Sequence, residues 1–149
     1  MSGNGSNHAL AGSWIVDSGV NQMKTIATYT PIGDGKYAAA ESVFNFDWSL
    51  GGAKPSATHA TALTGIVEDH GDTIRFVLLT YVLDAQEKAA YICKVTGTKV
   101  MKDLDTLSVQ NLVIHIYNDP ERCNPVTDVA DFTIPAEGTF PPIHEYRIK

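Results

Sequence analysis

The fold of this chain is decided by the stretch from Thr58 to Tyr117, which reads THATALTGIVEDHGDTIRFVLLTYVLDAQEKAAYICKVTGTKVMKDLDTLSVQNLVIHIY. It contains no proline, a residue that would remove a donor from the hydrogen-bonded ladder of a sheet. Runs rich in Val, Ile, Thr, Tyr and Phe alternate with short polar turns, and no segment keeps the apolar spacing of an amphipathic helix. We therefore predict four long strands that follow one another as an antiparallel meander.

Strands of similar composition flank this meander on both sides. Because the strands are long for a sandwich and most connections are short, closure into an up-and-down barrel is expected, which removes the exposed sheet edges. The predicted fold class is all-β, an eight-stranded antiparallel barrel. The expected strands are Ser13–Gly19, Met23–Thr30, Lys36–Asp47, Thr58–Glu68, Thr73–Asp84, Ala89–Met101, Thr106–Asn118 and His144–Lys149.

Length and composition indicate one globular domain. The chain has 149 residues, of which 44% are hydrophobic and 19% charged, so it can bury a core without metal or disulfide staples. Residues 1–9, which are rich in Gly, Ser and Asn, are assigned to a disordered leader, and residues 10–149 to a single barrel domain. Cys93 and Cys123 would pair only in an oxidising compartment.

Charge and hydropathy limit the partners. The 11 Lys and Arg against 17 Asp and Glu give a net charge of −6 without a basic cluster, so nucleic acid is not an expected partner. The apolar runs, Phe76–Leu79 among them, are far shorter than the roughly 18 residues of a membrane span. The first residues do not read as a signal peptide. A cytoplasmic location follows by default, although the mature form of a secreted protein would read the same way.

Connection lengths distinguish the two ends of the expected barrel. In a meander alternate loops lie at alternate ends, so one end receives only tight turns. The other end gathers the Gly-rich stretch Ser49–Ala57 and the Pro-rich segment Asp119–Ile143. A connection as long as the second is either a binding element or a segment laid across an outer face. It could also contain a ninth, short strand at Val129–Ile134.

Gly12-Ser13-Trp14 opens the first expected strand, and Arg147 lies near the end of the last. Strand parity brings Trp14 and Arg147 together at the tight-turn end, where a guanidinium can stack on an indole. The pair resembles the Gly-x-Trp motif and the C-terminal arginine of lipocalin-like, calycin-type barrel proteins. This resemblance implies a lipocalin-like barrel whose closed end is plugged by Trp14 and Arg147. The chain diverges from the typical members, because it lacks their Thr-Asp-Tyr element and their C-terminal helix.

Alternation within the strands predicts which side chains line the lumen. Charged or polar residues mark the outer face, which assigns Arg75, Lys94 and Gln110 to the outside. In the third strand the lumen is lined either by the set that contains Glu41 or by the set with Phe44 and Phe46, which its two aromatics favour. In the first case Glu41 is a buried acid with a raised pKa. The side chains expected around a ligand are Trp48, Phe76, Leu78, Tyr91, Asn111, Val113 and His115.

A mainly apolar lumen with scattered polar groups is typical of a binding site for a small hydrophobic molecule. Binding of such a molecule is the expected function. The alternative is a cofactor-independent cyclase or isomerase that acts on a small apolar substrate in the same cavity, in which His115, Glu41 or Tyr91 would move one proton. No nucleophile elbow or phosphate-binding loop occurs, and the histidine spacing does not suit a metal. No cofactor and no metal are therefore expected.

Two stretches, Phe76–Leu79 and Leu112–Ile116, are apolar on both faces of their strands. Since an apolar outer face needs cover, we expect a homodimer.

Overall fold

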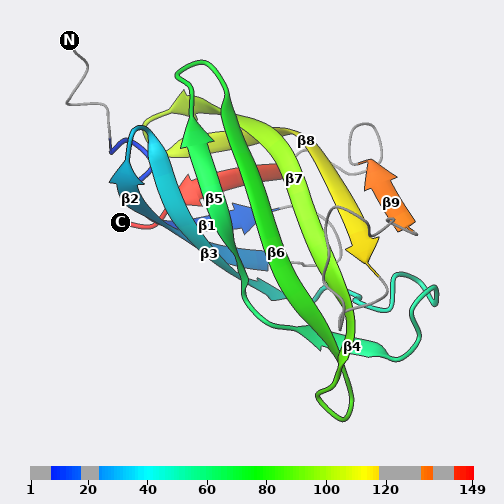
Figure 1. Cartoon of the computed structure of the whole chain (residues 1–149). Helices are drawn as coiled ribbons and strands as arrows, with labels where there is room; N and C mark the ends of the chain where they lie inside the picture. Colours follow the sequence, from blue (N-terminus) through cyan, green and yellow to red (C-terminus); the bar gives the residue numbers. More distant parts are fainter. Residues whose placement is uncertain (1–7, 18–23, 118–131, 136–142) are drawn as a thin grey trace.

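The structure is a computed structural model that describes residues 8–17, 24–117, 132–135 and 143–149. All of its regular elements in these residues are strands (Figure 1). They are β1 (Gly12–Asp17), β2 (Lys24–Gly33), β3 (Lys36–Phe44), β4 (Ala57–Ala60), β5 (Leu63–Asp69), β6 (Ile74–Asp84), β7 (Ala89–Asp103), β8 (Thr106–Tyr117), β9 (Phe132–Pro135) and β10 (Ile143–Arg147). Most of the expected leader lies outside the described residues.

Eight of these strands close into an antiparallel barrel in the order β1, β2, β3, β5, β6, β7, β8 and β10. The last strand closes it, because β10 pairs with β8 on one side and with β1 on the other. Ile143 lies opposite Val109 of β8, and Arg147 lies opposite Trp14 of β1. The predicted all-β, eight-stranded, up-and-down barrel is thus confirmed.

Two short strands supplement the barrel. β4 and β5 together replace the single strand expected at residues 58–68, and both pair with β6. They are separated near Thr61, whose N–H donates to the Tyr81 carbonyl. β9 pairs with residues 113–116 of β8, on the edge that β10 leaves unpaired beyond Val109. The expected ninth strand at residues 129–134 is therefore present, at Phe132–Pro135.

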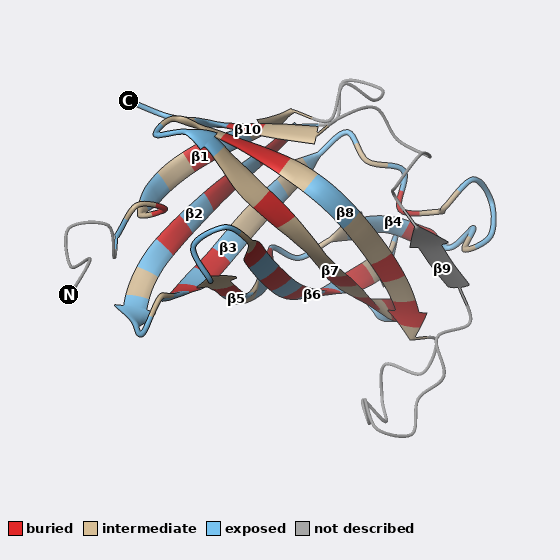
Figure 2. Cartoon of the chain, turned by 90° about the horizontal axis from the view of Figure 1, so that it is seen from above, coloured by how far each residue is buried: buried red, intermediate tan, exposed pale blue. Residues whose placement is uncertain are grey.

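Buried and exposed side chains alternate along β2 and β6, as the colours of Figure 2 show. In β6 the even-numbered residues Ile74, Phe76 and Leu78 are buried, whereas Arg75 is exposed as predicted. Phe76 lies opposite Gly97 of β7, where a Cβ would approach the Phe76 ring to 2.6 Å. Glycine at this position therefore leaves the space that the aromatic ring fills.

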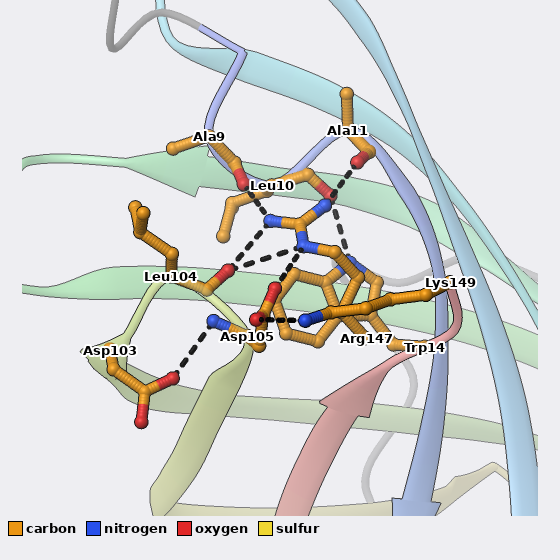
Figure 3. Close-up of polar contacts among 9 residues, drawn as sticks. All are labelled: Ala9, Leu10, Ala11, Trp14, Asp103, Leu104, Asp105, Arg147 and Lys149. Atoms are coloured by element: carbon orange, nitrogen blue, oxygen red, sulfur yellow. Dashed lines mark hydrogen bonds and ion pairs between the residues drawn. The ribbon is translucent and has the colours of Figure 1, made fainter.

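The closed end contains the expected stack of Trp14 and Arg147. Trp14 is completely buried, and its indole N–H donates to the Leu10 carbonyl at 2.9 Å. The Arg147 guanidinium carbon lies 4.3 Å from the centre of the Trp14 ring. Figure 3 shows the guanidinium spread over this end of the barrel, where it donates to the carbonyls of Ala9, Ala11 and Leu104 and pairs with Asp105. The expected contact between Trp14 and Arg147 is therefore present.

A β-bulge in β8 changes which side chains face the lumen. Thr98 of β7 pairs with Asn111, but its neighbour Lys99 pairs with Val109, so Gln110 has no partner in the ladder. An extra residue shifts the alternation by one position. Val109 lines the lumen as predicted, but beyond the bulge Leu112 and Ile114 line it. The prediction that Asn111, Val113 and His115 face inward is wrong for this reason.

The third strand faces inward with the set that contains Glu41. Tyr37 and Ala39 are buried, and Glu41 and Val43 line the lumen. Phe44 is 52% exposed. The set favoured by the two aromatics is therefore wrong for the strand itself. Phe46 nevertheless lines the cavity, because β3 ends at Phe44 and the left-handed conformation of Asn45 redirects the chain.

Candidate functional site

The barrel encloses a cavity of about 250 Å³. Its walls come from most strands of the barrel and from the turn that follows β3. The apolar lining consists of Val16, Val43, Phe46, Trp48, Leu63, Phe76, Leu78, Val95, Val109, Leu112, Ile114 and Ile143. The polar lining consists of Thr25, Glu41, Asn45, Asp47, Cys93, Lys99 and Glu145.

The turn after β3 brings two aromatic rings to the cavity. The Asp47 carboxylate accepts a hydrogen bond from the backbone N–H of Ser49 at 3.0 Å, a side-chain cap typical of Asx turns. This turn orients Phe46 and Trp48, whose ring centres lie 4.6 Å apart in an edge-to-face arrangement. The hydroxyl of Tyr91, on β7, donates to the Trp48 carbonyl at 2.7 Å. Tyr91 therefore fixes the backbone of this turn to β7.

A buried ion pair lies in the lumen. The Lys99 ammonium donates to the Glu145 carboxylate at 2.8 Å and to the Tyr29 hydroxyl at 2.6 Å. It also lies 4.4 Å from the centre of the Tyr29 ring and 5.2 Å from that of Phe76. Positive charge is attracted to both ring faces. Three strands, β2, β7 and β10, thus fix one ammonium group inside the barrel.

The Tyr29 hydroxyl faces two carboxylates but carries one proton. It is in short contact with the Glu145 carboxylate and lies 3.3 Å from that of Glu41. Since a hydroxyl donates one hydrogen bond, the closer Glu145 receives it. Burial and both carboxylates raise the pKa of Tyr29 well above its ordinary value, so this proton stays on the phenol. Glu41 is left with a long contact to an oxygen whose proton points elsewhere.

The environment of Glu41 raises its pKa toward neutrality. Burial raises its pKa to about 7; the Lys99 charge opposes this rise and the Glu145 charge adds to it. A carboxyl in this range exchanges protons readily under physiological conditions. Glu41 thus faces inward and is partly buried, as in the first of the two expected arrangements of the third strand.

The sequence-predicted site residues are only partly brought together. Trp48, Phe76, Leu78 and Glu41 line the cavity, and Tyr91 is buried beside it. Asn111, Val113 and His115 lie on the opposite face of β8; the amide of Asn111, for example, donates to the Thr98 hydroxyl at 2.7 Å.

Cys93 also lines the cavity as a free thiol, and burial raises its pKa to about 12. Cys123, with which Cys93 could form a disulfide in an oxidising compartment, lies outside the described residues. In the part of the chain that the structure describes, no three His, Cys, Asp or Glu side chains are placed to hold a metal ion.

Three residues of the charged cluster were missed in the sequence. Lys99 has the same parity as Tyr91 and Cys93 along β7, so extending the alternation would have placed it inside. A lysine is rarely buried, however, and its charge argues against an inward position. Glu145 and Tyr29 gave no such signal, because their pairing with Lys99 joins strands far apart in the sequence.

The fold and the cavity define the class of this protein: a closed eight-stranded antiparallel β-barrel, consistent with a calycin-like fold, with a charged cluster in its lumen. Comparison with protein-family models, with curated proteins and with solved structures gave no match to the chain. Among the described residues no helix is long and apolar enough to cross a membrane.

Proposed function

We propose that the protein binds a small, mainly apolar molecule in the barrel cavity. The observation that carries this proposal is a cavity of about 250 Å³ whose lining is mostly apolar and includes a few charged side chains. Ligand sites commonly combine a mostly hydrophobic lining with a few fixed polar groups. Their volumes range from roughly 300 to 1,000 Å³, so the ligand of this protein should be small.

Two kinds of side chain in the cavity lining would contribute to binding in different ways. Leu63, Leu78 and Ile114 supply apolar contact, which stabilises a ligand by about 25 cal/mol for each Å² of apolar surface removed from water. Lys99 and Glu145 are held in place by each other before a ligand arrives. Such fixed polar groups orient a ligand without a further loss of side-chain entropy.

A fluorescent, uncharged naphthalene probe tests this proposal. We expect saturable binding with a dissociation constant of about 1 μM, which is common for small apolar ligands. Binding should also quench or shift the fluorescence emission of Trp48. Trp14, the other tryptophan, is buried beneath Arg147 at the closed end and should respond little. Trp48→Phe should therefore abolish the change in protein emission while the probe still binds.

Two adjacent leucines provide a matched pair of variants. Leu78 lines the cavity, whereas Leu79 is 47% exposed on the outer face of the same strand. Leu78→Glu should weaken probe binding at least about tenfold, since it places a charge against the apolar ligand, and Leu79→Glu should leave it unchanged. Ile114→Thr, a milder change, repeats the test if Leu78→Glu does not fold. Folded wild-type protein without saturable probe binding would contradict the proposal.

A cofactor-independent isomerase or cyclase is the second candidate, and the raised pKa of Glu41 favours it. A carboxyl with a pKa of about 7 inside an apolar cavity can both accept and return a proton at neutral pH. A β,γ-unsaturated cyclic ketone is a suitable probe substrate: Glu41 would remove the α proton and return it to the γ carbon, giving the conjugated ketone. Turnover followed by ultraviolet absorbance should then be lost in Glu41→Gln. If wild type and Glu41→Gln convert the ketone equally slowly, the enzymatic candidate is excluded for this reaction class.

A further inference from the structure

The charges that line the cavity do not balance. Three carboxylates, those of Glu41, Asp47 and Glu145, face one ammonium, that of Lys99. Asp47 is exposed and tied into its turn by Ser49. Inside the lumen the imbalance is therefore that of two carboxylates against one lysine. A negatively charged ligand would meet repulsion there, and the low-dielectric walls would strengthen it.

The hydrogen bonds show which carboxylate lacks a partner. Glu145 receives the Lys99 ammonium at 2.8 Å and the Tyr29 hydroxyl. Glu41 has only the 3.3 Å contact to that hydroxyl, the longer of the two contacts that the hydroxyl makes with a carboxylate. Among the residues that the structure describes, no other donor is bonded to the Glu41 carboxylate. A partly buried carboxylate in this position requires either a proton or a donor from a ligand.

We infer that the natural ligand is a small cationic amphiphile, an apolar body with a protonated amine, and that Glu41 is the counter-ion of its amine. The inference rests on the proposed binding function and names its ligand class. An ammonium beside Glu41 brings the lumen cluster to neutrality and supplies the missing donor. The apolar body then lies against Val43, Leu78 and Val95, which share the cavity wall with Glu41.

This assignment also explains why Lys99 does not serve as the partner of Glu41. Lys99 directs its hydrogen bonds to Tyr29 and Glu145, and both of its flanks face aromatic rings. The lysine is thus committed to the cluster, and Glu41 is the carboxylate in the lumen to which Lys99 is not hydrogen-bonded. A neutral ligand would leave Glu41 to take up a proton instead.

Three ligands that share one chain length separate the possibilities. 1-Aminooctane, 1-octanol and octanoate are titrated as competitors of the uncharged naphthalene probe at pH 8, where Glu41 is mostly ionised and the amine is protonated. We expect the amine to bind about tenfold or more tighter than the alcohol, as is usual for a hydrogen bond between charged groups, and octanoate to bind weakest. In Glu41→Gln the amine and the alcohol should bind within about twofold of each other.

Glu87→Gln is the matched control, because it removes the same charge from an exposed turn outside the cavity and should keep the amine preference. Absence of probe binding would end the proposed function itself. If the probe and the alcohol bind but the amine binds no tighter than the alcohol, the inference of a cationic ligand is wrong and the proposed binding function stands. The same conclusion follows if octanoate binds tightest. An amine preference that persists in Glu41→Gln would overturn the role of Glu41.

Discussion

The Lys99 ammonium lies 2.8 Å from the Glu145 carboxylate in the lumen, and each of the two residues is 2% exposed. They belong to β7 and β10, which are separated in the sheet by β8. A buried pair gains little net stability over apolar residues of similar shape, because both charges lose their hydration. Breaking such a pair is costly, since the remaining charge is then buried alone. The pair therefore disfavours any closure of the barrel in which β10 would separate Glu145 from Lys99.

Lys99→Met should lower the free energy of unfolding by about 3–5 kcal/mol, the usual cost of leaving one buried charge without its partner. The measurement is urea denaturation at neutral pH. The double variant Lys99→Met/Glu145→Leu should lose much less than the sum of the single variants, since neither charge remains. Lys94→Met on the outer face of β7 is the control and should change stability by less than about 0.5 kcal/mol. If the loss of unfolding free energy in the double variant equals the sum of the losses in the two single variants, the two residues are not coupled.

The pKa of Glu41 predicts how stability depends on pH. Burial raises this pKa from its ordinary value of 4.5 to about 7, so between these pH values the folded protein holds a proton that the unfolded chain releases. The free energy of unfolding that Glu41 contributes therefore falls as the pH rises through this window. Glu41→Gln removes the effect. The variant should match wild type near pH 5 and exceed its stability by about 1–3 kcal/mol at pH 8.

The groups that face Glu41 are Tyr29, Lys99 and Glu145, and all three remain in Glu41→Gln. The difference between wild type and variant therefore isolates the one carboxyl. Glu87→Gln, which is exposed, should run parallel to wild type at every pH. A difference between Glu41→Gln and wild type that does not grow from pH 5 to pH 8 would contradict the raised pKa.

Much of the fold could be predicted because the signals are local. Alternation placed Phe76 and Leu78 inward, and strand parity brought Trp14 and Arg147 together at one end. The bulge at Gln110 left no local trace, so a strict period of two placed Asn111 and His115 on the wrong face. The charged cluster was missed for a different reason: it is stabilised by contacts between distant strands, which composition and spacing do not encode.

The closed end allows a third prediction. Trp14 is fully buried, and its ring is covered by the Arg147 guanidinium at 4.3 Å. Trp14→Ala should lower the free energy of unfolding by about 3–5 kcal/mol, because the cavity left behind adds to the lost burial. Arg147→Lys should cost about 1–3 kcal/mol, since an ammonium cannot reach all the carbonyls that the planar guanidinium bonds. Urea denaturation measures both, and a loss below about 1 kcal/mol for Trp14→Ala would contradict the packing role.

The homodimer expected from the sequence stays a prediction, but the structure changes the variant that tests it. Ile114 lines the cavity, so Ile114→Lys would perturb the lumen rather than an interface. Val77 and Leu79 are 44% and 47% exposed on the outer face of β6, and Val77 lies opposite the exposed Ile66 of β5. An apolar outer face of this kind commonly marks a contact surface between chains.

Leu79→Lys should therefore convert a dimer to monomers, because a charge at the centre of an apolar contact loses its hydration when the contact forms. Light scattering across the micromolar concentration range measures the mass of both proteins. Arg75→Lys, on the same face of β6 but outside the apolar set, should leave the mass unchanged. Wild-type protein that is monomeric at high micromolar concentration would rule out the dimer, and a dimer that persists in Leu79→Lys would place its interface on another face of the barrel.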